Sequence, residues 1–166
     1  MDFIKATAAH TERIMELIEE AKAFLRASGV NQWQDGYPNH GDIEADIADG
    51  IGYVLIDDGI ILAYTAIDFR GEEAYDTLKG QWLNDEPYVV IHRTAIDNTA
   101  KGKGLCQNIF QKVEDMARLR GVHNIRVDTD EDNIIMRHVI EKMGFSYCGT
   151  IWFANSVKIA FQKAQV

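Results

Sequence analysis

The 166-residue chain has only two cysteines, Cys106 and Cys148, and it has no long apolar run. Two cysteines at this spacing provide neither a disulfide framework nor a zinc site. We expect both to be reduced thiols, which favours a cytoplasmic location. No apolar run is long enough to span a bilayer, and residues 1–5 lack the features of a signal peptide. The sequence therefore predicts a soluble protein that does not contact a membrane.

Basic residues are also few, because 17 Lys and Arg stand against 26 Asp and Glu, for a net charge of −9. An acidic surface repels phosphate at long range, which argues against a nucleic-acid partner. The same charge would attract an amine or another cationic substrate, although acidic surfaces also serve solubility alone. Both interpretations stay open at this point.

No internal repeat, low-complexity tract or linker interrupts the chain. Its content of 46% hydrophobic and 26% charged residues is that of an ordinary globular protein. A chain of this length can bury a core without disulfides or metals. We therefore predict one domain over residues 1–166.

Hydrophobic periodicity predicts alternating strands and helices in the first half of the chain. The loop of residues 31–41 carries aromatic side chains, which would either cover a site or plug the core. Residues 70–86 are polar and turn-prone, and an insertion of this length is often functional. The expected elements are a strand over 2–7, a helix ending near 27, a short helix over 42–49, and a hairpin of 52–56 and 60–67 with an Asp-Gly turn.

The stretch of residues 88–145 organises the second half. A β-branched strand over 88–96 is followed by the loop Thr99-Ala100-Lys101-Gly102-Lys103-Gly104, and a helix opens at Leu105. Glycines let a backbone approach a bulky anion, and the N–H groups at a helix start carry partial positive charge. The loop is therefore predicted to hold phosphate, with Lys101 and Lys103 adding charge. A strand over 125–128, a helix opening at 132–136 and closing strands over 147–153 and 157–161 complete the pattern.

This ordered set resembles the GNAT superfamily of N-acetyltransferases, in a member of bacterial type. The family signature is Gln/Arg-x-x-Gly-x-Gly/Ala after a strand, followed downstream by Asn and Glu-Lys-x-Gly-Phe. The chain supplies Thr99-x-x-Gly102-x-Gly104, in which Thr99 departs from the usual residue, and later Asn133 and residues 141–145. The resemblance implies an α/β fold with a mixed, mostly antiparallel sheet, one splayed parallel pair and flanking helices.

The resemblance implies acetyl-CoA as the cofactor. Its pyrophosphate would lie on the backbone of residues 100–105, and its pantetheine arm would pair with the main chain of 94–96. Asn133 could cap its helix, reach the cofactor, or do both. Arg137 could meet the adenosine 3′-phosphate or be solvated only. No metal is expected. The predicted cofactor residues are Thr94, Ala95, Ile96, Ala100, Lys101, Gly102, Lys103, Gly104, Leu105, Asn133 and Arg137.

Amine acetylation needs a path for the amine proton and a donor for the leaving thiolate. His92 interrupts an apolar strand just before the cofactor segment, so we predict it as the base. The alternative is a histidine that is hydrogen-bonded in or beside the sheet. The family's usual acid, a tyrosine, corresponds to Ile140 here. Tyr147 is predicted instead, with Tyr64, Tyr88 or Cys148 as alternatives, or the thiolate leaves without an acid.

Aromatic residues indicate a pocket for an amine that carries apolar bulk. The candidates are Trp33, Tyr64 and Trp82, although Trp82 could serve only to pack its loop. The predicted function is N-acetylation of a small-molecule or peptide amine. An acyl-CoA-binding sensor without turnover is the alternative, and transfer to a hydroxyl or of a longer acyl group is a third. The acceptor and a possible homodimer are not fixed by the sequence.

Overall fold

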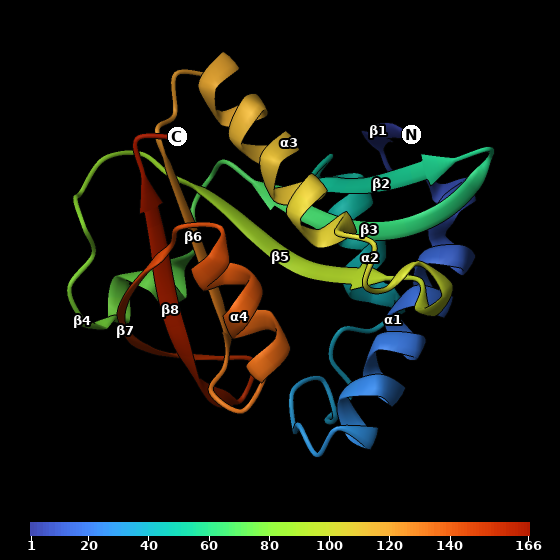
Figure 1. The fold of residues 1–166 in the computed structure, drawn as a ribbon, viewed down its shortest axis with the longest axis horizontal. Helices are drawn as coiled ribbons and strands as arrows, with labels where there is room; N and C mark the ends of the chain where they lie inside the picture. Colours follow the sequence, from blue (N-terminus) through green and yellow to red (C-terminus); the bar gives the residue numbers. More distant parts are fainter. The chain divides into compact units, whose positions relative to one another are not determined.

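The computed structural model describes all residues, 1–166, and the chain forms two compact units (Figure 1). Unit 1 comprises Met1–Ile67 and His92–Cys106, and unit 2 comprises Asp68–Ile91 and Gln107–Val166. Strand β5 (Val89–Ile96) and helix α3 (Leu105–Leu119) each begin in one unit and end in the other. The single domain over residues 1–166 stays a prediction.

The sheet of unit 1 has the strand order β1-β2-β3-β5. Strands β1 (Asp2–Lys5), β2 (Gly52–Asp57) and β3 (Ile60–Asp68) pair antiparallel in sequence order. Asp58 and Gly59 join β2 to β3 with φ of 47° and 78°, the left-handed conformations that a two-residue hairpin turn requires. The predicted hairpin with an Asp-Gly turn is therefore confirmed.

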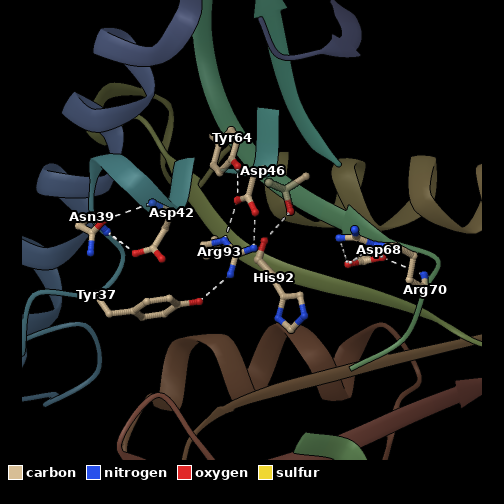
Figure 2. Close-up of polar contacts among 10 residues, drawn as sticks. Tyr37, Asn39, Asp42, Asp46, Tyr64, Asp68, Arg70, His92 and Arg93 are labelled. Atoms are coloured by element: carbon tan, nitrogen blue, oxygen red, sulfur yellow. Dashed lines mark hydrogen bonds and ion pairs between the residues drawn. The ribbon is translucent and has the colours of Figure 1, made fainter. Parts of the chain in front are cut away.

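Helices α1 (Thr11–Ala27) and α2 (His40–Ala48) belong to unit 1. Ile14, Leu17 and Ile18 repeat at helical spacing on α1 and join a buried cluster with residues of α2 and of strands β2, β3 and β5. Helix α2 begins two residues earlier than the predicted residue 42. The reason is Asn39, whose side chain accepts a hydrogen bond from the Asp42 N–H and so caps the helix (Figure 2).

The sheet of unit 2 has the strand order β5-β6-β8-β7-β4. Strand β5 pairs parallel with β6 (Asn124–Asp130), and the other pairs, with β7 (Ser146–Phe153), β8 (Ser156–Ala164) and β4 (Lys79–Gly80), are antiparallel. Helix α4 (Ile134–Lys142) connects β6 to β7. The chain thus has the predicted mixed, mostly antiparallel sheet with one parallel pair and flanking helices.

The insertion of residues 70–86 contributes to the core of unit 2. Its short 3-10 helix (Glu73–Thr77) carries Tyr75, which is 1% exposed and packs with Val90, Ile151 and Ala160. The Tyr75 hydroxyl donates to the Asp128 carboxylate at 2.7 Å. The hydrogen bond compensates the cost of removing this hydroxyl from water, so this side chain anchors the insertion.

No helix combines the length and the apolar character that crossing a bilayer would demand.

Candidate active site

The loop between β5 and α3 has the geometry of an anion site. Gly102 and Gly104 have φ of 76° and 75°, a left-handed conformation that favours glycine. A Cβ on Gly102 would meet no atom within 4 Å, so the backbone there faces open space. Helix α3 begins at Leu105, and the first N–H groups of a helix have no partner within it. Backbone N–H groups at a helix start, preceded by glycines in this conformation, are a known arrangement for binding phosphate.

The start of this loop is held by a turn around Asp97. One carboxylate oxygen of Asp97 accepts from the Thr99 N–H at 2.7 Å and from the Thr99 hydroxyl. The hydrogen bond from the Thr99 hydroxyl is the largest cause that lowers the pKa of Asp97, followed by that from the Thr99 N–H and by Arg13. Thr99 therefore has a structural role at the position where the family signature has Gln or Arg.

The two lysines of the loop have different surroundings. Lys103 is exposed, whereas the Nζ of Lys101 is buried, lies 3.7 Å from the ring centroid of Phe24 and has no hydrogen-bond partner. Burial lowers the pKa of Lys101. Of the two predicted cationic residues, only Lys103 extends into solvent.

His92 is buried in β5 and lies two to four residues before the predicted pantetheine segment, Thr94 to Ile96. Its carbonyl oxygen accepts from the Thr65 hydroxyl at 3.2 Å, and the hydroxyls of Thr65 and Thr94 lie 2.9 Å apart. Figure 2 shows the His92 ring on the side of the strand away from Asp46 and Tyr64. Ala95 packs in the core of unit 1.

A buried ion pair that the sequence did not predict lies beside His92. Arg93 has a φ of 50°, which interrupts the regular strand, and its guanidinium donates to the Asp46 carboxylate at 2.8 and 2.6 Å. The hydroxyl of Tyr64 donates to the same carboxylate at 2.6 Å, and Arg93 Nη1 donates to the Tyr37 hydroxyl oxygen at 2.7 Å (Figure 2). A buried carboxylate with three donors is well compensated.

The two aromatic residues of unit 1 that were predicted to contact substrate, Tyr64 and Trp33, both pack within this unit. Tyr64 has no exposed surface, and burial together with the Asp46 charge raises its pKa, so the hydroxyl stays protonated. Trp33 packs against the buried cluster of unit 1. In the loop of residues 31–41, Trp33 thus packs on the core, while Tyr37 binds Arg93. Substrate contact by Trp33 and Tyr64 stays a prediction.

Three predicted site residues lie in unit 2 on or near α4. Asn133 caps the helix, since its side chain accepts from the Met136 N–H at 3.2 Å. Arg137 donates to the Glu131 carbonyl at 3.0 Å. Tyr147, in β7, is 60% exposed, and its ring is T-shaped to that of Phe161. The capping role of Asn133 is present, and the cofactor roles of Asn133 and Arg137 stay predictions.

The other unit 2 candidates are buried or packed. The indole N–H of Trp82 donates to the Tyr75 carbonyl at 3.1 Å, and the guanidinium of Arg126 lies 4.1 Å from the Trp82 ring centroid. Ile140, at the position of the family's tyrosine, is 1% exposed. Burial raises the pKa of the Cys148 thiol. Trp82 therefore makes the contacts expected of a residue that packs its loop, which was the alternative to a role in substrate binding.

Unit 2 also contains a pocket of about 600 Å³ that no predicted site residue lines. Glu72 and Glu73 contribute acidic groups, and Trp152 and Val157, both more than half exposed, contribute apolar surface. Trp152 and Val157 are cross-strand partners near the turn between β7 and β8, so their side chains are neighbours on one face. We find no group of three or more His, Cys, Asp or Glu side chains that could hold a metal ion.

The comparisons with known proteins agree with this geometry. The model of the acetyltransferase (GNAT) family matches residues 12–145. A GNAT-family acetyltransferase from Streptococcus agalactiae 2603 is 38% identical, with 99% of this chain and 95% of that chain covered and a TM-score of 0.91. No curated protein sequence matches the chain.

More distant structures share the fold. A GNAT-family acetyltransferase from Listeria monocytogenes 4b F2365 is 20% identical over 98% of this chain and 94% of its own, with a TM-score of 0.78. A ribosomal-protein-alanine N-acetyltransferase from Brucella melitensis is 17% identical over 99% of both chains, with a TM-score of 0.68. At these identities the likeness concerns the fold alone.

The chain belongs to the GNAT acetyltransferase family. The resemblance inferred from the motif of residues 99–104 and from residues 133–145 is confirmed. The chain is therefore an acyltransferase by family, and the family transfers acyl groups from acyl-CoA.

Proposed function

We propose that the protein is an acetyl-CoA-dependent N-acetyltransferase that acts on a primary amine of a small molecule or peptide. The loop before α3 carries this proposal, because its two left-handed glycines precede the free N–H groups of a helix start. Backbone N–H groups of residues 100–105 would hold the pyrophosphate. Lys103 would add a positive charge, and the main chain of residues 94–96 would bind the pantetheine arm.

The chemistry is direct attack of the amine on the thioester. The amine nitrogen forms a bond to the acetyl carbon, and the bond from that carbon to sulfur breaks. His92 would accept the amine proton, directly or through a water, and a main-chain N–H near Ala95 or Ile96 would polarise the carbonyl. Tyr147 would return a proton to the thiolate. Ile140 is a buried apolar side chain and cannot take that role.

The acceptor is proposed to be an amine with apolar bulk. The net charge of −9 attracts cations. The pocket of unit 2 is lined by Glu72 and Glu73, by one opposing cation, Lys79, and by the exposed indole of Trp152. The excess of carboxylates and the indole face suit an ammonium group on an apolar body. If the acceptor uses this pocket, Trp152→Ala should raise the KM for the amine and leave the KM for acetyl-CoA unchanged.

The test is release of free thiol from acetyl-CoA in the presence of polyamines, arylalkylamines, amino acids and short peptides. We expect turnover with one class of amine. His92→Ala should lose most of that activity and recover it only at high pH, where the free amine forms without a base. His123→Ala, which replaces an exposed histidine directly before β6, is the control and should keep full activity.

Two outcomes would contradict the assignment as an enzyme, and a third would contradict the role of His92. Saturable CoA binding without turnover of any amine would favour the acyl-CoA sensor. Absence of CoA binding would exclude both the enzyme and the sensor. Equal activity of His92→Ala and the wild type at all pH values would exclude His92 as the base and leave the enzyme assignment intact.

A further inference from the structure

One face of α1 contacts the loop that precedes Gly102. Arg13, Glu20 and Phe24 are spaced seven and four residues apart, which places them in one stripe along the helix. Arg13 forms an ion pair with Asp97, and Glu20 accepts a hydrogen bond from the Asn98 N–H at 2.9 Å. Phe24 lies beneath the Lys101 ammonium. The three contacts follow the order of the loop, at Asp97, Asn98 and Lys101.

These contacts fix the residues just before the anion-binding backbone. Asp97 is held on one side by Arg13 and on the other by the N–H and hydroxyl of Thr99. The Asn98 N–H, at the start of a three-residue 3-10 helix, is satisfied by Glu20. A loop whose backbone is fixed before a ligand arrives loses less conformational entropy on binding. The contacts from this face of α1 should therefore raise the affinity of the loop for the cofactor.

The same contacts separate the two lysines of the loop. The buried Lys101 ammonium is over an aromatic face and near the carboxylates of Glu20 and Asp97. To reach a phosphate it would have to leave all three groups. Lys103 is exposed and has no such competition.

We propose that Arg13, Glu20 and Phe24 of α1 are positioning residues for the phosphate loop, that Lys101 joins them through Phe24, and that Lys103 is the one lysine of the loop that meets the cofactor phosphate. This inference rests on the proposed function, because it assumes that the loop binds CoA. It assigns opposite roles to two lysines that the sequence places symmetrically around Gly102.

Binding of CoA, measured by isothermal titration calorimetry at low and high salt, tests the two lysines. Lys103→Met should weaken binding at low salt and flatten the dependence of Kd on salt, because it removes an exposed charge that ions screen. Lys101→Met keeps an apolar contact with Phe24 and should leave the salt dependence as in the wild type. A flattened dependence for Lys101→Met, or an unchanged one for Lys103→Met, would overturn the assignment.

A matched pair on α1 tests the positioning role. Glu20→Ala removes the hydrogen bond to the Asn98 N–H and the 3.7 Å ion pair with Arg13. We expect it to raise the Kd for CoA by about three- to tenfold, because the loop is then less well fixed before the cofactor binds. It should also raise the KM for acetyl-CoA while the KM for the amine stays unchanged. Glu19→Ala, at the neighbouring position where the carboxylate pairs only within the helix with Lys22, should stay within about twofold of the wild type. Equal Kd values for the two variants would overturn the positioning role.

Arg13 provides a check against general loss of folding. Arg13→Ala should raise the Kd, and Arg13→Lys should restore part of the affinity because it can still pair with Asp97. A variant with a raised Kd at an unchanged melting temperature supports positioning, whereas Kd values that follow the melting temperature contradict it. Failure of the wild type itself to bind CoA would refute the proposed function, so the two failures can be told apart.

Discussion

Cys106 shows how burial of a single residue determines reactivity. Its thiol lies at the start of α3, and burial raises its pKa to about 12. The thiolate is the nucleophilic form of cysteine, so this thiol is inert near neutral pH. Cys148 is also buried, and burial raises its pKa. The protein should therefore add little background to an assay that measures thiol release.

We predict that a disulfide reagent such as dithionitrobenzoate reacts slowly with the folded protein and with both cysteines after unfolding. The measurement is the absorbance change with and without denaturant. Rapid reaction of one or both thiols in the folded state would contradict the burial of these residues.

Asp46 and Arg93 form the other residue-level feature with a measurable consequence. Asp46→Asn leaves the Arg93 guanidinium buried without a counter-charge. We predict a loss of about 3 to 5 kcal/mol in the free energy of unfolding, as for other broken buried pairs. Urea denaturation measures it. Glu44→Gln on the same helix, where the carboxylate is exposed, is the control and should change stability by less than about 0.5 kcal/mol. Equal effects of the two substitutions would contradict the account.

At the scale of elements, strand β4 depends on a close approach of two glycines. Gly80 and Gly149 pair directly, with φ of 145° and 146°. A Cβ on Gly149 would lie 2.2 Å from the Lys79 carbonyl oxygen, which the backbone cannot accommodate in place. The pairing of β4 with β7 therefore requires glycine at both positions.

We predict that Gly149→Ala lowers the free energy of unfolding by about 1 to 3 kcal/mol, through strain at this φ and loss of the pairing. Hydrogen exchange at Lys79 and Gly80 should accelerate more than exchange in β6. Ser146→Ala, at the exposed start of the same strand, is the control and should be close to neutral. A stable Gly149→Ala protein with protected β4 amides would refute the need for glycine.

The elements with strong local signals were predictable. The Asp-Gly turn fixed the β2–β3 hairpin, and the glycines before Leu105 fixed the start of α3. Strand β4 was not predictable, because two residues carry no periodicity and the pairing depends on a glycine 69 positions away. The Asp46–Arg93 pair was missed for a related reason, since the partners are 47 residues apart and belong to different elements.

The site could be predicted only where local sequence determines it. The glycine loop and the helix after it follow from residues 99–105 alone. The different positions of Lys101 and Lys103 do not, because they depend on Phe24, Glu20 and Asp97. The sequence of a loop does not indicate whether the ammonium group of its lysine faces solvent or an aromatic ring.

At the scale of the whole molecule, the family and the charge point to the same kind of chemistry. A net charge of −9 attracts the cationic acceptor that we propose, whereas the anionic cofactor would be held against this charge by the local backbone dipoles at the start of α3. The buried Ile140 lies where the family resemblance implies a tyrosine acid. Turnover without that tyrosine is therefore the central claim.

The most direct test incubates the wild-type protein with acetyl-CoA and the amine panel, and measures both free CoA thiol and acetylated amine by mass spectrometry. The account predicts that the two products form in equal amounts with one class of amine, and that His92→Ala reduces both together. Thiol release without an acetylated amine would mean hydrolysis, and saturable CoA binding without either product would mean a sensor. Either result would contradict the assignment as an N-acetyltransferase.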